Sequence, residues 1–406
     1  MRAQLAGVWV DRSLNEPHHW LVAKLPMNLI RAIKAGATIT LRAWVVEVDG
    51  YLIGSFGLTV YDDAAAPRTF FGCCRGEEET ADLQVVLAAG RFPLQFHNEN
   101  FLPLLYAQCR IDPEPARAVI ALLPSAVYPT EQGLKLSGLA NDVVEGVLSG
   151  KADPRIKASC DLPVLFEQDQ TIKVILAGIG EVNLTDADEG GELERLTFAA
   201  FDSLFPYGVF HRPDFDKGGT REELCDVLAV SRMREADGEG IFVIQNKVAS
   251  AFPDGLKRKT ERRAKSIQKN IMHGIRQLKG AIDNLREGKT IYRTKGGTSI
   301  EVDPPMPDLV GVVEPLNLRE RASQIGQGIV LISDMHEGVD WEEVFSALAK
   351  VWLSTQYYCQ VLDLMELGRL LTHSEGRPAL LEWLLLRRGQ VMVEKKTAFI
   401  RFRFRD

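Results

Sequence analysis

Residues 264–285 carry a long helical pattern that constrains how this chain can fold. Seven apolar residues recur there at intervals of three or four: Ala264, Ile267, Ile271, Ile275, Leu278, Ile282 and Leu285. This spacing places them on one face of an α-helix of about six turns. Gly288 follows, and glycine commonly ends a helix. We therefore expect a long helix whose apolar stripe is covered by the rest of the fold.

The opposite face of this expected helix is basic. Lys265, Lys269 and Arg276 lie nearly half a turn from the apolar stripe, and Arg262 precedes them. Residues 257–289 contain eleven Lys and Arg against three Asp and Glu, a net charge of +8. Such a cluster can bind a phosphate backbone, although most charged runs are solvated helix faces. Both interpretations stay open, and nucleic-acid binding is the one that the preceding segments favour.

Two strand-like segments come before the helix. Residues 224–230 (LCDVLAV) and 241–247 (IFVIQNK) are apolar runs joined by a polar loop, a pattern typical of a hairpin. Upstream, apolar residues at helical spacing predict a helix over 191–204. The expected order is therefore helix, strand, strand, helix.

The region before residue 185 has a different pattern. Segments such as TITLRAWVVEV and YLIGSFGLTVY are rich in β-branched and aromatic residues, and Gly50 lies in a turn between these two. We expect a strand-rich α+β region at 1–184, which serves sensing, recognition or oligomerisation. We expect residues 185–406 to form a second domain, with a core at 190–290 and an extension at 291–406. The expected fold class is α/β in this core and α+β overall.

Composition excludes several classes of protein. The chain has 406 residues, of which 46% are hydrophobic and 25% charged, as in ordinary globular proteins. No apolar run approaches the roughly 18 residues of a membrane-spanning helix, and Asp11 and Arg12 interrupt the short apolar start. The six cysteines form no Cys-x-x-Cys pair. We expect a cytoplasmic protein with reduced thiols and no membrane partner.

The two strand-like segments bring chemistry together. Side chains alternate along a strand, so Gln245 and Lys247 face one way and Asn246 the other. If the segments pair, Asp226 lies beside Gln245 and Lys247. A carboxylate and an amide oxygen can hold Mg²⁺, while a lysine orients water or opposes charge on phosphorus. The grouping suits hydrolysis of a phosphodiester.

This arrangement resembles the PD-(D/E)xK nuclease superfamily, and Gln in the IQNK segment is similar to its Mrr-like branch. The resemblance covers about residues 190–290 and, more weakly, the strands and helices that follow. It implies a restriction-endonuclease-like mixed sheet flanked by helices. It implies that Asp226, Gln245 and the main-chain carbonyl of Asn246 bind Mg²⁺ or Mn²⁺, and that Lys247 is catalytic. It also implies that Glu223 and Glu194 are accessory acids.

The chain departs from the family pattern at two positions. Cys225 stands where the proline before the aspartate would be, and Gln245 brings no charge to the metal. The neutral ligand predicts a lower affinity for Mg²⁺ and favours one metal ion over two.

We therefore expect a Mg²⁺-dependent endonuclease that cleaves DNA in preference to RNA. By analogy with restriction and anti-phage effectors, it would act in bacterial defence as a dimer or tetramer. One alternative is a catalytically silent module of the same fold that binds nucleic acid or assembles protein without cutting. Another places the functional centre in the N-terminal region, where no catalytic grouping is found.

Overall fold

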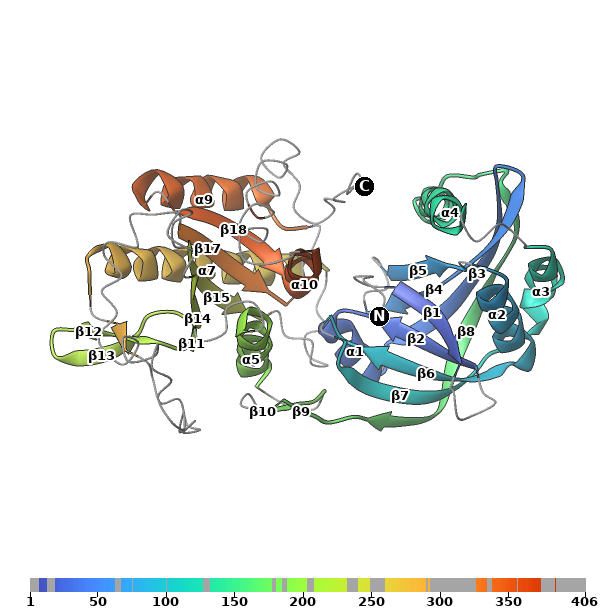
Figure 1. Ribbon diagram of the computed structural model, residues 1–406, viewed down its shortest axis with the longest axis horizontal. Helices are drawn as coiled ribbons and strands as arrows, with labels where there is room; N and C mark the ends of the chain where they lie inside the picture. The colour runs from blue at the N-terminus through green and yellow to red at the C-terminus, as the bar shows by residue number, and fades with distance from the viewer. Residues whose placement is uncertain are drawn as a thin grey trace. The chain divides into compact units, whose positions relative to one another are not determined.

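The computed structural model of the chain describes most of its residues (Figure 1). The described residues are 7–12, 19–62, 67–74, 76–99, 101–126, 132–176, 180–184, 188–202, 208–231, 240–248, 260–289, 291–292, 326–333, 338–355, 357–373 and 384. They mix helices with large sheets, which confirms the expected α+β fold. Much of the expected extension at 291–406 lies outside the described residues. Within them, no helix is both long and apolar enough to cross a membrane.

The chain divides into two compact units. The N-terminal unit consists mainly of residues 1–174, and the C-terminal unit mainly of residues 186–250 and 257–406. A small two-stranded sheet pairs β9 (Val174–Leu176) with β10 (Gly180–Val182), and residues 175–182 belong to the C-terminal unit.

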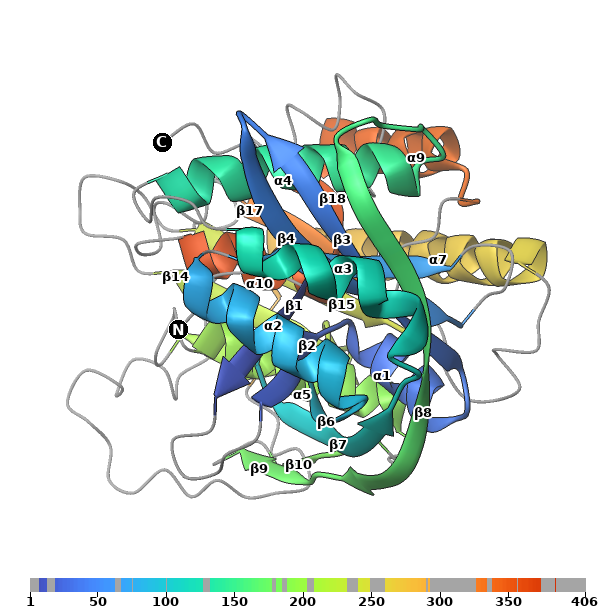
Figure 2. The same ribbon diagram turned by 90° about the vertical axis from the view of Figure 1, so that its right-hand side faces the viewer.

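The N-terminal unit is built on one curled sheet. Its described strands follow the order β1-β2-β6-β7-β8-β3-β4-β5 and are antiparallel except for the β2–β6 pair. The two edge strands, β1 and β5, lie close to each other: a Cβ on Gly72 of β5 would lie 2.6 Å from the Val8 carbonyl oxygen of β1. Helices α2, α3 and α4 lie over the strands (Figure 2). The elements are β1 (Gly7–Arg12), β2 (His19–Lys24), α1 (Met27–Lys34), β3 (Thr38–Val48), β4 (Tyr51–Tyr61), β5 (Arg68–Cys73), α2 (Glu77–Ala89), β6 (Arg91–His97), β7 (Pro103–Arg110), α3 (Arg117–Leu122), α4 (Gly133–Leu148) and β8 (Ile156–Thr171).

The C-terminal unit contains a mixed five-stranded sheet in the order β11-β14-β15-β17-β18. The first three strands are antiparallel, and β15, β17 and β18 are parallel. A separate three-stranded sheet has the order β13-β12-β16. The elements are α5 (Glu189–Asp202), β11 (Val209–His211), β12 (Asp214–Lys217), β13 (Thr220–Glu223), β14 (Val227–Ser231), β15 (Gly240–Lys247), α7 (Thr260–Arg286), β16 (Ile291–Tyr292), β17 (Gly326–Ile332), α9 (Trp341–Thr355), β18 (Tyr358–Asp363) and α10 (Leu364–His373).

Helices cover both faces of the five-stranded sheet. The apolar stripe of α7 packs with α9 against side chains from β14, β15, β17 and β18. On the other face, α5 contacts β11, β14 and β15, and the Phe201 and Phe242 rings lie 5.9 Å apart. α10 contacts β18 and α5. Burial of the long stripe of α7 explains why the sheet and helix form one core.

Two Asp side chains mark the first residues of helices α9 and α10. Asp340 Oδ1 accepts hydrogen bonds from the Glu342 and Glu343 N–H groups at the start of α9, each at 3.1 Å. Asp363 Oδ1 accepts one from the Glu366 N–H at 2.7 Å, at the start of α10. These side chains satisfy amide groups that have no partner within the helix.

Candidate active site

Asp226 lies at a bend where strand β14 begins. His211 of β11 pairs with Val227, and the Arg212 N–H donates to the Asp226 carbonyl at 2.8 Å. At the next residue pair, the Leu224 N–H donates to the Pro213 carbonyl at 2.7 Å. Arg212 and Pro213 are adjacent, whereas their partners Asp226 and Leu224 are separated by Cys225, which is therefore an extra residue on the segment that leads into β14. Such a β-bulge bends the strand and re-aims its side chains.

The bulge corrects one expectation from the sequence. The strand expected over 224–230 begins at Val227, and residues 214–223 form the hairpin β12–β13, which was not expected. Pro213 has no N–H to continue the ladder, and the hairpin pairs with β16 instead of the five-stranded sheet. Asp226 therefore lies directly before β14, at the point where the chain passes from the hairpin into the five-stranded sheet.

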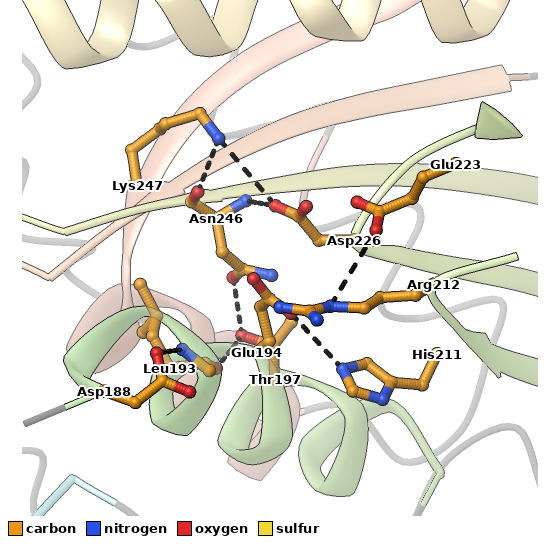
Figure 3. Close-up of polar contacts among 11 residues, drawn as sticks. Asp188, Leu193, Glu194, Thr197, His211, Arg212, Glu223, Asp226, Asn246 and Lys247 are labelled. Carbon is orange, nitrogen blue, oxygen red and sulfur yellow. Dashed lines mark hydrogen bonds and ion pairs between the residues drawn. The ribbon is translucent and has the colours of Figure 1, made fainter. Parts of the chain in front are cut away.

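The Asp226 carboxylate is buried next to β15 (Figure 3). Its Oδ2 accepts a hydrogen bond from the Asn246 N–H at 2.5 Å and lies 4.0 Å from Lys247 Nζ. Burial raises the pKa of Asp226 to about 6; the Asn246 N–H and Lys247 oppose this rise, and Glu194 and Glu223 add to it. Because burial disfavours the ionised carboxylate, a cation bound next to Asp226 would stabilise its ionised form.

Lys247 ends β15 between the sheet and α7. Its Nζ donates to the Asn246 carbonyl at 2.8 Å, and its side chain is 17% exposed. Gly274 of α7 makes room for the lysine stem, because a Cβ there would lie 3.2 Å from Lys247 Cγ and 2.8 Å from Val330 Cγ1. The Asn270 side chain also donates to the Val248 carbonyl at 2.9 Å. Helix α7 thus fixes both the lysine stem and the end of its strand.

Gln245 and Asn246 are both buried, and their side chains point to opposite faces of the five-stranded sheet. The Asn246 Oδ1 lies 2.8 Å from Thr197 Oγ1 of α5, so this side chain is held on the opposite face from α7. Gln245 is 3% exposed, and its Oε1 has no hydrogen-bond donor among the described residues. Buried acceptors normally have a partner, so the Gln245 oxygen is suited to a ligand such as a cation.

Glu194 and Glu223 meet at an arginine. Arg212 Nε donates to Glu194 Oε2 at 2.6 Å and lies 4.0 Å from Glu223 Oε2, while His211 Nε2 lies 3.4 Å from Glu194 Oε2. Burial opposes the ionised form of Glu194, but the hydrogen bonds from His211 and Arg212 outweigh it and lower the pKa of Glu194. Arg212 and His211 were not expected from the sequence, because no motif marks the segment HRPDFD.

The donor set can be compared with what a divalent metal ion needs. Asp226, the Gln245 oxygen and the Asn246 carbonyl are hard oxygen ligands of the kind that Mg²⁺ and Mn²⁺ prefer. Among the described residues, no three His, Cys, Asp or Glu side chains form a metal-binding group. Asp226 would therefore be the anionic ligand of a shell completed by neutral oxygens and water. The buried Gln245 oxygen fits this role.

The four basic residues predicted to bind nucleic acid lie on the exposed face of α7. Arg262, Lys265, Lys269 and Arg276 are all exposed, whereas the apolar stripe of the same helix is buried. The six cysteines are buried and free, as expected for reduced thiols.

Comparison with known proteins adds no relative. No protein-family model, no curated protein and no solved structure matches the chain.

Proposed function

We propose that this protein is a metal-dependent nuclease that hydrolyses phosphodiester bonds, with DNA as the favoured substrate. One observation carries the proposal: the buried carboxylate of Asp226 lies 4.0 Å from the Lys247 ammonium group. The same strand as Lys247 carries Gln245, whose buried side-chain oxygen has no donor among the described residues. The mixed sheet with α5 and α7 on opposite faces supports it further, since the resemblance implies a mixed sheet flanked by helices.

The residues divide the chemistry between them. Asp226, Gln245 and the Asn246 carbonyl would hold Mg²⁺ or Mn²⁺. Such an ion polarises a phosphate and helps a bound water to lose a proton. Lys247, 4.0 Å from the carboxylate, can hold the attacking water or oppose the negative charge that develops on phosphate oxygens. The exposed basic side chains of α7 would contact the phosphate backbone of the nucleic acid.

A silent binding module is the second candidate. It is favoured by the pairing of Glu194 with Arg212, which engages one of the two expected accessory acids. In that case the same surface would bind nucleic acid or protein without cutting.

Cleavage assays separate these two functions. Wild-type protein is expected to cut plasmid or single-stranded DNA or RNA with Mg²⁺ or Mn²⁺ and to lose this activity in EDTA. Asp226→Ala and Lys247→Ala are expected to abolish it, whereas Glu342→Gln, an exposed change on α9, should not. If every substrate stays intact while the wild type still binds DNA, the silent module is the better description.

The basic face of α7 has its own expected result. Replacing Lys265, Lys269 and Arg276 with glutamine should weaken DNA binding and reduce the slope of log affinity against log salt by about two to three. Fluorescence anisotropy over a salt series measures both, in EDTA to prevent cleavage. Lys350→Gln, an exposed charge change on α9, is the matched control. An unchanged slope in the triple variant would remove this helix from the proposed contact surface.

A further inference from the structure

Arg212 is held in the site by its main chain as well as by its side chain. Its φ of 46° lies in the left-handed region, which residues other than glycine rarely adopt. Its N–H donates to the Asp226 carbonyl at 2.8 Å, and Pro213 follows it at the bulge. A backbone of this kind persists where the surrounding structure imposes it, and such positions cluster at functional sites.

The guanidinium serves the two accessory acids together. Its Nε lies 2.6 Å from Glu194 Oε2 and 4.0 Å from Glu223 Oε2. Glu194 is 8% exposed, so its charge has little solvent to stabilise it. Breaking its contact with Arg212 would leave a buried, poorly compensated carboxylate, which is costly.

Among the described residues, the Lys and Arg side chains close to the carboxylates of Asp226, Glu194 and Glu223 are Lys247 and Arg212. Asp226 has Lys247 nearby, while Glu194 and Glu223 have Arg212. A divalent ion at Glu194 and Glu223 would have to displace the guanidinium. No guanidinium is hydrogen-bonded to the Asp226 carboxylate among the described contacts, which are the Asn246 N–H at 2.5 Å and Lys247 Nζ at 4.0 Å. The neighbouring strand β15 also carries the buried Gln245 oxygen, which has no donor among the described residues.

We propose that Arg212 takes the place of a second metal ion at Glu194 and Glu223, so that the site holds a single divalent ion at Asp226. This inference rests on the proposed nuclease function. Arg212 is then a positioning residue: it fixes the accessory acids and keeps a permanent positive charge beside the site. Its guanidinium stays charged at any physiological pH, so this half of the site needs no metal.

Metal stoichiometry tests the proposal without measuring activity. The full chain is titrated with Mn²⁺ by isothermal titration calorimetry, and the bound Mn²⁺ is examined by electron paramagnetic resonance. The wild type and Arg212→Lys should bind a single ion, which Asp226→Asn removes. Arg212→Gln should bind a second ion, with a spectrum broadened by the neighbouring Mn²⁺. Adding Glu194→Gln to Arg212→Gln should remove that second ion.

A milder variant keeps the test decisive if Arg212→Gln does not fold. Glu223 is about half exposed, so Glu223→Gln should leave the fold intact. If Arg212 occupies the acids, Glu223→Gln leaves Mn²⁺ affinity nearly unchanged. A loss of about tenfold or more, as for a residue that supports the metal, would overturn the inference.

The outcomes also separate this inference from the proposed function. A wild type that binds no Mn²⁺ through Asp226 overturns both. If the wild type binds a single ion through Asp226 and a folded Arg212→Gln variant also binds only that one, the role of Arg212 falls while the proposed function stands.

Discussion

Replacing Lys247 with methionine is expected to lower the rate of nucleic-acid cleavage by about 10²–10³-fold, the usual effect of losing one group that stabilises developing charge. Methionine keeps an unbranched stem against Gly274 but removes the ammonium group that lies 2.8 Å from the Asn246 carbonyl. Because Lys247 is not among the expected metal ligands, Mn²⁺ should still bind at pH 8. The loss should therefore appear in the cleavage step under saturating metal, in single-turnover assays.

Lys247 also affects the carboxylate beside it. Its charge opposes the rise in the pKa of Asp226, so Lys247→Met should shift the pH dependence of Mn²⁺ binding towards higher pH. Lys350→Met on α9 is the matched control and should change neither cleavage nor the pH dependence. Unchanged cleavage by a folded Lys247→Met variant would contradict a catalytic role for the lysine.

The regular parts of the fold could be predicted from local sequence, because their signals are strong and short in range. The stripe of α7 and the IFVIQNK strand both appear where the periodicity places them. The expected turn at Gly50 is also confirmed: Asp49 and Gly50 both have positive φ between the paired strands β3 and β4. In each case the residues that specify the element lie within it.

The rest of the site depends on contacts between residues that are distant in sequence or without a motif. The bulge at Cys225 arises from how two strands pair around Pro213, and an apolar run such as LCDVLAV carries no sign of it. The need for glycine at 274 comes from Val330 and Lys247, which approach from other elements. Arg212 becomes recognisable only in the folded structure, where Glu194 of α5 and Glu223 of β13 lie beside its guanidinium.

Asp226→Asn is expected to abolish metal-dependent cleavage and, at the same time, to stabilise the metal-free C-terminal unit at neutral pH. The asparagine retains an acceptor for the Asn246 N–H and removes a buried charge. The pKa of Asp226 is raised from 3.8 to about 6, chiefly by burial. At about 1.4 kcal/mol for each pKa unit, the gain in the free energy of unfolding should be about 1–3 kcal/mol.

The pH dependence of this gain has a definite sign. A carboxyl whose pKa is higher in the folded state binds more protons there than in the unfolded chain at pH values between the two. The free energy of unfolding of the wild type therefore falls as pH rises from about 4 to about 6, and the full penalty remains above that range. The advantage of Asp226→Asn should grow over the same interval and then stay constant.

Urea unfolding in EDTA at pH 5 and pH 8 measures this difference, with amide exchange of β15 peptides followed by mass spectrometry to report on the C-terminal unit itself. Glu342→Gln, which removes an exposed charge on α9, should give no comparable gain. Equal stability of Asp226→Asn and the wild type at pH 8 would mean that burial does not penalise this carboxylate. A gain that appears without metal and is offset when the wild type binds Mn²⁺ would mean that Asp226 is retained for the ion, at the expense of the stability of the metal-free fold.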